Sequence, residues 1–474
     1  MIRFHLRDIL RGTGGALITS AVGPEMYTGI STDSRTVAPG EVFFALRGEK
    51  HDGHDHLKDA WKAGAVLAVV DRRFPMNAGM MAPIPLVVVD DTVKALQGLA
   101  ALWRVRHPMP ALAVVGSAGK TTTKEMTAAV LGTAGPCLKN IGNLNNHIGL
   151  PLSILEMADF HRYAVLEIGT NMPGEIRQLA SILGPEGAIL TRIGWAHLEG
   201  FGDHETLLAE KLSILDALPG DGWCAVNAGD PNQASVPARA ACRVVTYGIG
   251  TGEVRGKDLV ISECESAFTL VSPSGSERVR LCAFGVHFVE NALAVAAGVL
   301  PLGIPIEQVA GGLDGWRPAR QRGGIISPMP GVRFIDDTYN ANPLSVETAL
   351  ANLARLSSEG VTVAVLGEMK ELGAYHEEGH RLVGLKAARM GIDYLIAVGE
   401  VAPLIVEGAL RGSMERSRVM ECGTIGEAVK AVEPLLTSGV WVLFKGSRAA
   451  RVEEVMEPFV GSGDNGALAG SGGI

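Results

Sequence analysis

The chain has 474 residues, more than one hydrophobic core usually organises, and a domain size of about 150 residues predicts about three domains. Its 47% hydrophobic content and 60 glycines indicate a globular α/β protein rich in tight turns, and exclude a largely disordered chain. A formal net charge of −9 provides no global basic surface for nucleic acid, and no stretch reaches the ~18 apolar residues that a membrane span needs.

The six cysteines are scattered and include no C-x-x-C pair, so neither a zinc ribbon nor a disulfide scaffold is indicated. The first segment, MIRFHLRDILRGTGG, lacks a continuous apolar region followed by a cleavage site, so no secretion signal is indicated. We therefore expect a cytoplasmic protein with buried thiols.

The first hundred residues contain short β-like runs, at 42–46, 66–70 and 86–89. They end near HPMP (107–110), where two prolines in four residues favour a linker. We predict an N-terminal domain over residues 1–108.

From residue 111 the pattern changes to apolar strands that alternate with amphipathic helices. The predicted strands are ALAVV, YAVLEI and GAILTRI, and the helices that follow them span 120–131, 175–183 and 205–215. Such alternation predicts a mostly parallel sheet with helices on both faces. This central domain is predicted over 109–322.

The polar segment LDGWRPARQRGG (313–324) predicts a hinge, and a further series of strands and helices follows it. This series predicts a third α/β domain over 323–458, with helices at 343–356 and 377–390. The Gly- and Ser-rich end of the chain, 459–474, is predicted to be a disordered tail.

The segment AVVGSAGKTTTKEM runs an apolar strand into a glycine-bearing loop and the start of a helix. Gly116 and Gly119 let backbone N–H groups converge on phosphate oxygens, Lys120 supplies positive charge, and Thr121 supplies a hydroxyl for Mg²⁺. The motif is a shortened G-x-x-G-K-T, because Val114 stands where the usual P-loop has glycine. A chance GKT in a glycine-rich turn is the alternative, which the flanking strand and helix disfavour.

Three further side chains are candidates for the chemistry. Glu167 ends a predicted strand, where open parallel sheets hold their ligand residues, and a buried glutamate there is costly unless it meets a cation such as Mg²⁺. The alternative is a glutamate that caps a turn. His197 follows another strand and Lys211 lies on the next helix; taken singly, they read as a structural histidine and a solvated lysine.

Together these residues resemble a known family. The ordered segments are GSAGKTTTKEM, GNLNNHIGLPLSIL, LEIGTNMPGEI, AHLEGFG with Lys211 downstream, NALAVAA, IDDTYNANPLS, LGEMKELG and KGSRAARVEEV. They resemble the Mur ligase family over essentially the whole chain except the tail. The loop and the Glu and His positions are shared with folylpolyglutamate synthases, whereas GNLNNHIG and DDTYNANP are specific to the dipeptide-adding member.

The resemblance implies a central P-loop ATPase domain with a parallel sheet, and a C-terminal Rossmann-like domain. It implies ATP-driven amide formation: the carboxylate of UDP-N-acetylmuramoyl-tripeptide is activated as an acyl phosphate, and the amine of D-alanyl-D-alanine displaces phosphate to give the pentapeptide precursor of peptidoglycan. It also implies two Mg²⁺ ions and a carbamylated Lys211, since a protonated ammonium cannot bind a metal. A monomer is the expected oligomeric state.

The resemblance also assigns residue roles. The catalytic residues would be Lys120, Glu167, His197 and Lys211, and the metal ligands Thr121, Glu167, His197 and carbamylated Lys211. The ATP site would comprise Gly116, Ser117, Ala118, Gly119, Lys120, Thr121, Thr122, His287, Asn291, Arg322, Asp336, Tyr339 and Asn340. The uridine-nucleotide site would comprise Ser34, Arg35, Arg47, Asp52, Gly53 and His54.

Several points remain open in the sequence. Phe288 stands where relatives often have asparagine, Arg320 is a rival to Arg322, and the third residue of the tripeptide is not specified. Another amide ligase of the superfamily is one competing hypothesis. A P-loop switch or transport ATPase is the other, although we locate no Walker B aspartate.

Overall fold

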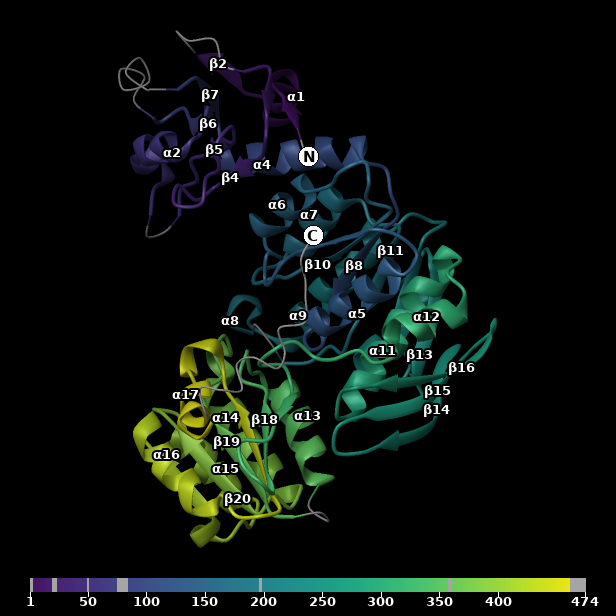
Figure 1. The fold of residues 1–474 in the computed structure, drawn as a ribbon, viewed down its shortest axis with the longest axis vertical. Coiled ribbons are helices and arrows are strands. Elements are labelled where there is room, and N and C mark those ends of the chain that lie inside the picture. Colours follow the sequence, from purple (N-terminus) through teal and green to yellow (C-terminus); the bar gives the residue numbers. More distant parts are fainter. Residues whose placement is uncertain are drawn as a thin grey trace.

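The computed structural model describes residues 3–18, 24–48, 51–74, 84–195, 198–356 and 360–460. Three α/β units, each built on its own sheet, follow one another along the long axis of the molecule, with the N-terminal unit at the top of Figure 1. The expected fold class is therefore confirmed. The exact domain boundaries stay predictions, and the predicted tail lies outside the described residues except for 459 and 460.

The N-terminal unit has a five-stranded sheet of order β2-β7-β6-β5-β4, in which only β2 is antiparallel, and a small β1-β3 ribbon. Its elements are β1 (Phe4–His5), α1 (Leu6–Thr13), β2 (Ala16–Ile18), β3 (Met26–Tyr27), β4 (Ile30–Ser31), β5 (Val42–Phe44), η1 (Gly53–His56), α2 (Leu57–Ala63), β6 (Leu67–Asp71), β7 (Leu86–Val89) and α4 (Thr92–Arg106).

Helix α4 connects this unit to the next. Asp91 caps its first turn by accepting from the N–H groups of Val93 and Lys94. The Trp103 indole N–H donates to the Met157 carbonyl (2.9 Å), and one continuous core runs from the first sheet to the second. The two units therefore share an apolar interface at α4.

The central unit has a nine-stranded sheet of order β16-β15-β14-β13-β12-β11-β8-β10-β9. Its strands are β8 (Ala111–Val115), β9 (Cys137–Lys139), β10 (Tyr163–Glu167), β11 (Gly187–Leu190), β12 (Trp223–Asn227), β13 (Arg243–Ile249), β14 (Val254–Ile261), β15 (Ser266–Ser272) and β16 (Gly275–Leu281). Its helices are α5 (Lys120–Gly132), α6 (Gly149–Leu155), α7 (Glu175–Leu183), α8 (Leu198–Phe201), α9 (His204–Leu212), α10 (Val236–Arg239), α11 (Val286–Val299) and α12 (Ile306–Leu313).

The strands β8 to β14 form a parallel sheet, as predicted for its first strands, and β15 and β16 extend it with antiparallel pairs that the sequence did not indicate. The predicted helix 205–215 is shorter: α9 ends at Leu212 and a 3-10 turn follows. Side chains of β8 alternate between two cores: Ala111, Ala113 and Val115 face one, while Leu112 and Val114 face the other. Helices therefore cover both faces of this sheet.

The C-terminal unit has a six-stranded sheet of order β17-β18-β22-β19-β20-β21, parallel except for the edge strand β17. Its elements are β17 (Gly324–Ile326), β18 (Val332–Asp336), α13 (Pro343–Ala354), β19 (Thr362–Leu366), η5 (Gly373–Tyr375), α14 (His376–Arg389), β20 (Tyr394–Val398), α15 (Ala402–Arg411), β21 (Val419–Cys422), α16 (Ile425–Val432), β22 (Val440–Lys445) and α17 (Glu453–Met456).

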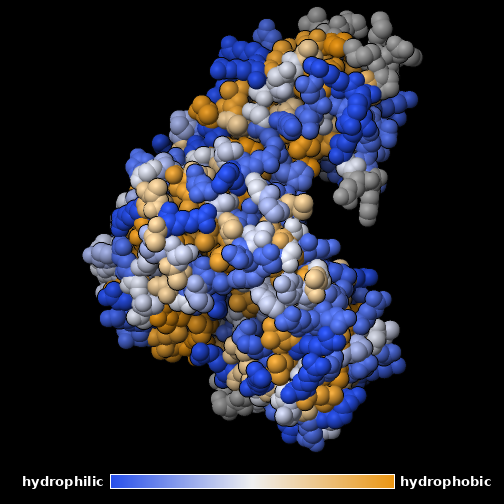
Figure 2. Space-filling model, turned by 180° about the vertical axis from the view of Figure 1, so that it is seen from behind, coloured by the Kyte–Doolittle hydropathy of each residue, from blue (hydrophilic) through white to orange (hydrophobic). Residues whose placement is uncertain are grey.

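The surface is hollowed on one side between the upper and lower parts of the molecule, as Figure 2 shows from behind. Of the helices in the described ranges, none is both long and apolar enough to cross a lipid bilayer.

Candidate active site

A cavity of about 740 Å³ lies between the central and C-terminal units. The P-loop and the end of β10 form one wall, and the residues that follow β18 and β22 form the other. The predicted residues that line it are Ser117, Ala118, Gly119, Lys120, Thr121, Thr122, Glu167, His287, Asn291, Arg322, Tyr339 and Asn340. Segments more than 200 residues apart in the chain thus meet in one cavity.

The two glycines of the loop are required by close approaches. Gly119 has a φ of +85°, and a Cβ at this position would lie 2.6 Å from Oδ1 of Asn291. A Cβ on Gly116 would lie 2.0 Å from the Thr191 hydroxyl. The Arg192 carbonyl accepts from the N–H groups of Ser117 (2.8 Å) and Ala118 (3.2 Å), which ties the start of the loop to the end of β11.

The Glu167 carboxylate faces the first turn of α5. Its Oε2 accepts from the Thr121 hydroxyl (2.7 Å), and its Oε1 accepts from the side-chain amide of Asn145 (2.8 Å). This pairing provides oxygen ligands of the kind that Mg²⁺ prefers. No group of three or more His, Cys, Asp or Glu side chains that could hold a metal is found in the described part of the chain, and His197 lies outside it.

Two lysines lie near this carboxylate. Burial lowers the pKa of Lys120, and the negative charge of Glu167 opposes that effect. Lys211 is fully buried, and its Nζ has no hydrogen-bond partner among the described residues. Burial, reinforced by the charge of Lys120, lowers the pKa of Lys211 well below its ordinary value, so the solvated lysine expected from the helix pattern is not what is observed.

The neighbouring Glu210, in contrast, has a structural role. Its carboxylate accepts from the N–H groups of Gly174 (2.7 Å) and Ile176 (2.8 Å), and so caps the first turn of α7.

His287, at the start of α11, is held neutral. Burial lowers its pKa to about 3, and the positive charges of Lys445 and Arg192 act in the same direction. Its Nδ1 lies 2.8 Å from the amide nitrogen of Asn352, whose oxygen accepts from the Val286 N–H (3.4 Å). Because the amide donates to Nδ1, the ring proton is on Nε2.

The C-terminal wall contributes a cation and a helix end. The Arg322 guanidinium lies 3.8 Å from the centre of the Tyr339 ring, whereas Arg320 is exposed. Asn342 caps α13 in a reciprocal capping box with Ser345, and its amide nitrogen lies 3.5 Å from the Ser117 carbonyl. The C-terminal unit therefore contacts the P-loop directly.

Two adjacent aspartates at the end of β18 have different environments. The Asp336 carboxylate accepts from the Thr338 hydroxyl (2.7 Å) and does not line the cavity. Asp337 lines it and accepts from the buried Lys445 ammonium (2.6 Å), which also donates to the Asn340 carbonyl (3.0 Å). The structure thus brings Asp337, and not the predicted Asp336, to the cavity wall.

A second contact joins the two units beside the cavity. The Glu199 N–H donates to the Glu371 carbonyl (3.1 Å), and the rings of Trp195 and Tyr375 lie 5.2 Å apart. The C-terminal unit therefore packs on α8 as well as on the P-loop.

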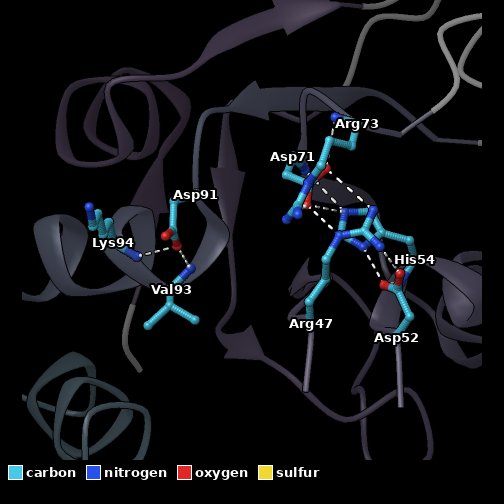
Figure 3. A network of polar contacts seen from close by, with 8 residues as sticks. All are labelled: Arg47, Asp52, His54, Asp71, Arg73, Asp91, Val93 and Lys94. Atoms are coloured by element: carbon cyan, nitrogen blue, oxygen red, sulfur yellow. Dashed lines mark hydrogen bonds and ion pairs between the residues drawn. The ribbon is translucent and has the colours of Figure 1, made fainter. Parts of the chain in front are cut away.

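The predicted uridine-nucleotide residues divide into two groups. In the first, a network at the ends of β5 and β6 joins Arg47, Asp52 and His54 to Asp71 and Arg73 (Figure 3). The Arg47 guanidinium donates to Asp71 (2.6 Å) and also contacts Asp52. Burial alone would raise the pKa of Asp71, but hydrogen bonds from Arg47 and Arg73 lower it well below its usual range.

The imidazole of His54 bonds two members of this network, Asp52 and Asp71. Its Nε2 accepts from the Asp71 N–H (3.0 Å), so Nδ1 carries the proton and donates to Asp52 (2.6 Å). A Cβ on Gly53 would lie 2.8 Å from the Leu46 nitrogen, which explains the glycine between Asp52 and His54.

The second group is more exposed. Arg35 makes a bidentate pair with Asp33 (2.9 and 2.6 Å), and Ser34 is half-buried beside it. Arg35 is bonded locally to Asp33, and the hydrogen bonds described above do not join it to the Arg47 network.

Sequence reasoning assigned no role to Asn145, Asp71, Arg73, Asp337 or Lys445. Asp71 and Lys445 each end a strand of a parallel sheet, a position that indicates ligand residues, and Asn145 belongs to the asparagine-rich GNLNNHIG segment. The sequence contains these signals, but it does not show which groups each side chain contacts.

The chain matches three models of one family: the catalytic domain of the Mur ligase family over residues 26–104, the Mur ligase middle domain over 114–299, and the Mur ligase glutamate ligase domain over 322–448. The UDP-N-acetylmuramoyl-tripeptide–D-alanyl-D-alanine ligase of Bacillus subtilis (strain 168) is 34% identical over 463 residues, covering 98% of this chain and 99% of the relative.

Solved structures give the same result. The crystal structure of MurF from Acinetobacter baumannii superposes with a TM-score of 0.89 at 32% identity, over 97% of this chain and 99% of that chain. MurF ligase from Thermotoga maritima, in complex with ADP, superposes with a TM-score of 0.80 at 28% identity, over 91% and 96%. With relatives this similar over nearly the full length, the chain belongs to the Mur ligase family.

Proposed function

We propose that this protein is an ATP-dependent ligase that joins D-alanyl-D-alanine to UDP-N-acetylmuramoyl-tripeptide through an acyl phosphate. One observation carries the proposal: a single cavity is lined by the P-loop on one side and by the C-terminal unit on the other. The Bacillus subtilis relative, which matches nearly the full length, bears the name of this activity. The product would be the pentapeptide precursor of peptidoglycan.

The first chemical step brings two anions together, the peptide carboxylate and the γ-phosphate of ATP. Lys120 and the N–H groups at the start of α5 would bind the phosphates and reduce this repulsion. Thr121 and Glu167 supply the oxygen atoms that would hold Mg²⁺, which neutralises charge on the transferring phosphoryl group when bound. His197 is proposed as a further ligand, although it lies outside the described residues.

In the second step, the dipeptide amine attacks the acyl carbon, forms the amide bond and releases phosphate. An acyl phosphate hydrolyses readily, so water must be excluded until the amine arrives. The contacts of Asn342 with Ser117 and of Glu371 with Glu199 support this role, because they close the C-terminal unit over the P-loop.

Lys211 has the properties that carbamylation requires. A neutral amine can attack CO₂, forming an N–C bond and releasing a proton, whereas an ammonium cannot. The lowered pKa of Lys211 favours the neutral amine, as does its Nζ, which has no hydrogen-bond partner within the described ranges. The resulting carbamate would place negative charge beside Lys120 and supply oxygen ligands, so we propose this modification.

The predicted nucleotide residues of the N-terminal unit remain part of the proposal. Arg47 and Arg73 converge on Asp71, so two guanidinium groups lie within one network. Such a pair is suited to an anionic ligand such as a diphosphate. For ATP, the family supports use of the nucleotide, and we propose His287, Asn291 and Arg322 as its contacts in the cavity.

A phosphate-release assay tests the function. Purified protein is incubated with ATP, Mg²⁺ and UDP-N-acetylmuramoyl-tripeptide, with and without D-alanyl-D-alanine. We expect turnover that depends on the dipeptide, with one amide product formed per phosphate. Folded protein without dipeptide-dependent turnover would reject the proposal and favour another ligase of the superfamily, whose acceptor a panel of amino acids would identify.

A further inference from the structure

A second lysine on α5 lies one turn beyond Lys120 and is not used by the mechanism above. Lys124 is fully buried, and its ammonium donates to the Asn140 main-chain carbonyl (2.6 Å) and pairs with Glu125 (3.0 Å). Burying a lysine is costly, and a neutral donor would have satisfied a single carbonyl. That carbonyl belongs to Asn140, whose side chain bonds the backbone of Glu167, so the lysine supports a residue of the site.

Asn140 lies at the point where β9 leaves the sheet. The last backbone pair between β9 and β10 is Lys139 with Val165. Beyond it, the Asn140 side chain replaces the missing strand: Oδ1 accepts from the Glu167 N–H (3.0 Å), and Nδ2 donates to the Glu167 carbonyl (3.1 Å). The Asn140 side chain thus bonds both the N–H and the carbonyl of Glu167.

The same amide also orders the asparagine-rich loop. Nδ2 of Asn140 donates to the Leu144 carbonyl (2.9 Å), and the next residue, Asn145, donates to Oε1 of Glu167. The Gly169 N–H donates to the Asn145 carbonyl (2.8 Å), and a Cβ on Gly169 would lie 2.7 Å from the Asn145 side-chain oxygen. The loop is therefore pressed against the end of β10, with its anchor at Asn140.

Lys124 and Thr121 belong to the same helix. Because the two residues lie within one turn of α5, the bond from Lys124 to Asn140 ties the helix that carries the Thr121 hydroxyl to the segment that bonds Glu167. We propose that Lys124 and Asn140 are positioning residues that align these two oxygen ligands for Mg²⁺. The proposal rests on the proposed function only in taking Mg²⁺ with a nucleotide as the occupant of this site.

The test is calorimetric and does not require turnover. The dissociation constant of ADP is measured with and without Mg²⁺ for the wild type and for Lys124→Met, which keeps the length of the side chain but removes the donor. Loss of groups that orient a metal ligand typically costs about 10- to 100-fold in metal affinity. We expect the Mg²⁺-dependent gain in ADP affinity to fall by about that factor, with ADP binding in the absence of Mg²⁺ unchanged.

Lys139→Met is the matched control. Lys139 contacts the same Glu125 from the more exposed side and makes no side-chain bond to Asn140, so its loss should leave the Mg²⁺ effect intact. Asn140→Ala provides a second variant, to be used alongside Lys124→Met with circular dichroism as the check of folding. We expect the same selective loss of the Mg²⁺ effect.

In steady-state assays, we expect Lys124→Met and Asn140→Ala each to need about tenfold more Mg²⁺ for half-maximal rate, with an unchanged KM for the dipeptide. The positioning role would be overturned if folded Lys124→Met or Asn140→Ala kept the full Mg²⁺-dependent gain in ADP affinity. It would also be overturned if Lys139→Met lost as much of this gain as they do. If the wild type binds Mg²⁺–ADP but shows no dipeptide-dependent turnover, the proposed function fails while the positioning role is still decided by calorimetry.

Discussion

Lys211 makes a quantitative prediction about stability and pH. Its ammonium would be buried with no hydrogen-bond partner in the part of the chain that the structure describes, and burial lowers its pKa in the folded protein well below the ordinary value of about 10.4. Between these two pKa values the unfolded chain binds one proton more than the folded protein. The free energy of unfolding therefore rises with pH over this window, and the contribution falls as the pH is lowered.

One proton of difference corresponds to a slope of about 1.4 kcal/mol per pH unit. Between pH 7 and pH 9, Lys211 would contribute an increase of at most about 3 kcal/mol, the limit reached when the folded protein holds the neutral amine throughout. Lys211→Met removes the titrating group but keeps the apolar part of the side chain, so the variant should lose this increase.

The assay is urea unfolding of wild type and Lys211→Met at pH 7 and pH 9, in buffer freed of CO₂ so that the amine stays unmodified. The measured quantity is the pH-dependent change in unfolding free energy of the wild type minus that of the variant. Lys58→Met, which removes an exposed lysine, is the matched control. Parallel pH dependence in wild type and Lys211→Met would refute the argument, since Lys211 would then hold the same proton in both states.

Three further outcomes are expected, two in the ligase assay and one in a calorimetric measurement of ATP binding. Lys211→Ala should lose most of the turnover. Acetate or formate should restore part of it, since a small carboxylate can replace the carbamate. Full activity without the additive would contradict the role in metal binding. Glu167→Gln keeps an acceptor for Thr121 but removes the charge, so turnover should fall on the order of 10²-fold or more, and a rate near that of the wild type would argue against a metal ligand. Gly119→Ala should abolish ATP binding measured by calorimetry, because the added Cβ would lie 2.6 Å from Asn291 in a left-handed backbone conformation; unchanged affinity would mean that the loop can shift.

The P-loop was readable from the sequence because the whole signal is local. The strand at 111–115, the glycines and the helix from Lys120 follow one another without a gap, and period-two and period-3.6 patterns identify each element. The predicted helix 175–183 agrees with α7 for the same reason. Strand ends also share one edge of a parallel sheet, so Glu167 could be assigned to the site without knowledge of its partners.

The strands β14 to β16, which include the two antiparallel pairs, were missed because their short amphipathic runs lack a crossover helix, which was the signal used for the rest of the sheet. The predicted helix over 205–215 was too long, because the apolar spacing continues through residues that form a 3-10 turn. In both cases the local pattern was compatible with more than one backbone conformation, and tertiary packing decided which one formed.

The sequence by itself determined the α/β fold class and indicated candidate site residues such as the P-loop and Glu167, because residue type, spacing and position at strand ends are properties of short segments. Only the tertiary structure decided what each of them contacts: that the buried Lys211 ammonium has no hydrogen-bond partner in the described ranges, that Asp337 meets Lys445 while Asp336 accepts from Thr338, and that Lys124 bonds Asn140, which in turn bonds Glu167. Burial and hydrogen-bond partners set the charge and reach of a side chain, and both depend on segments that are distant in the chain and meet only when it folds.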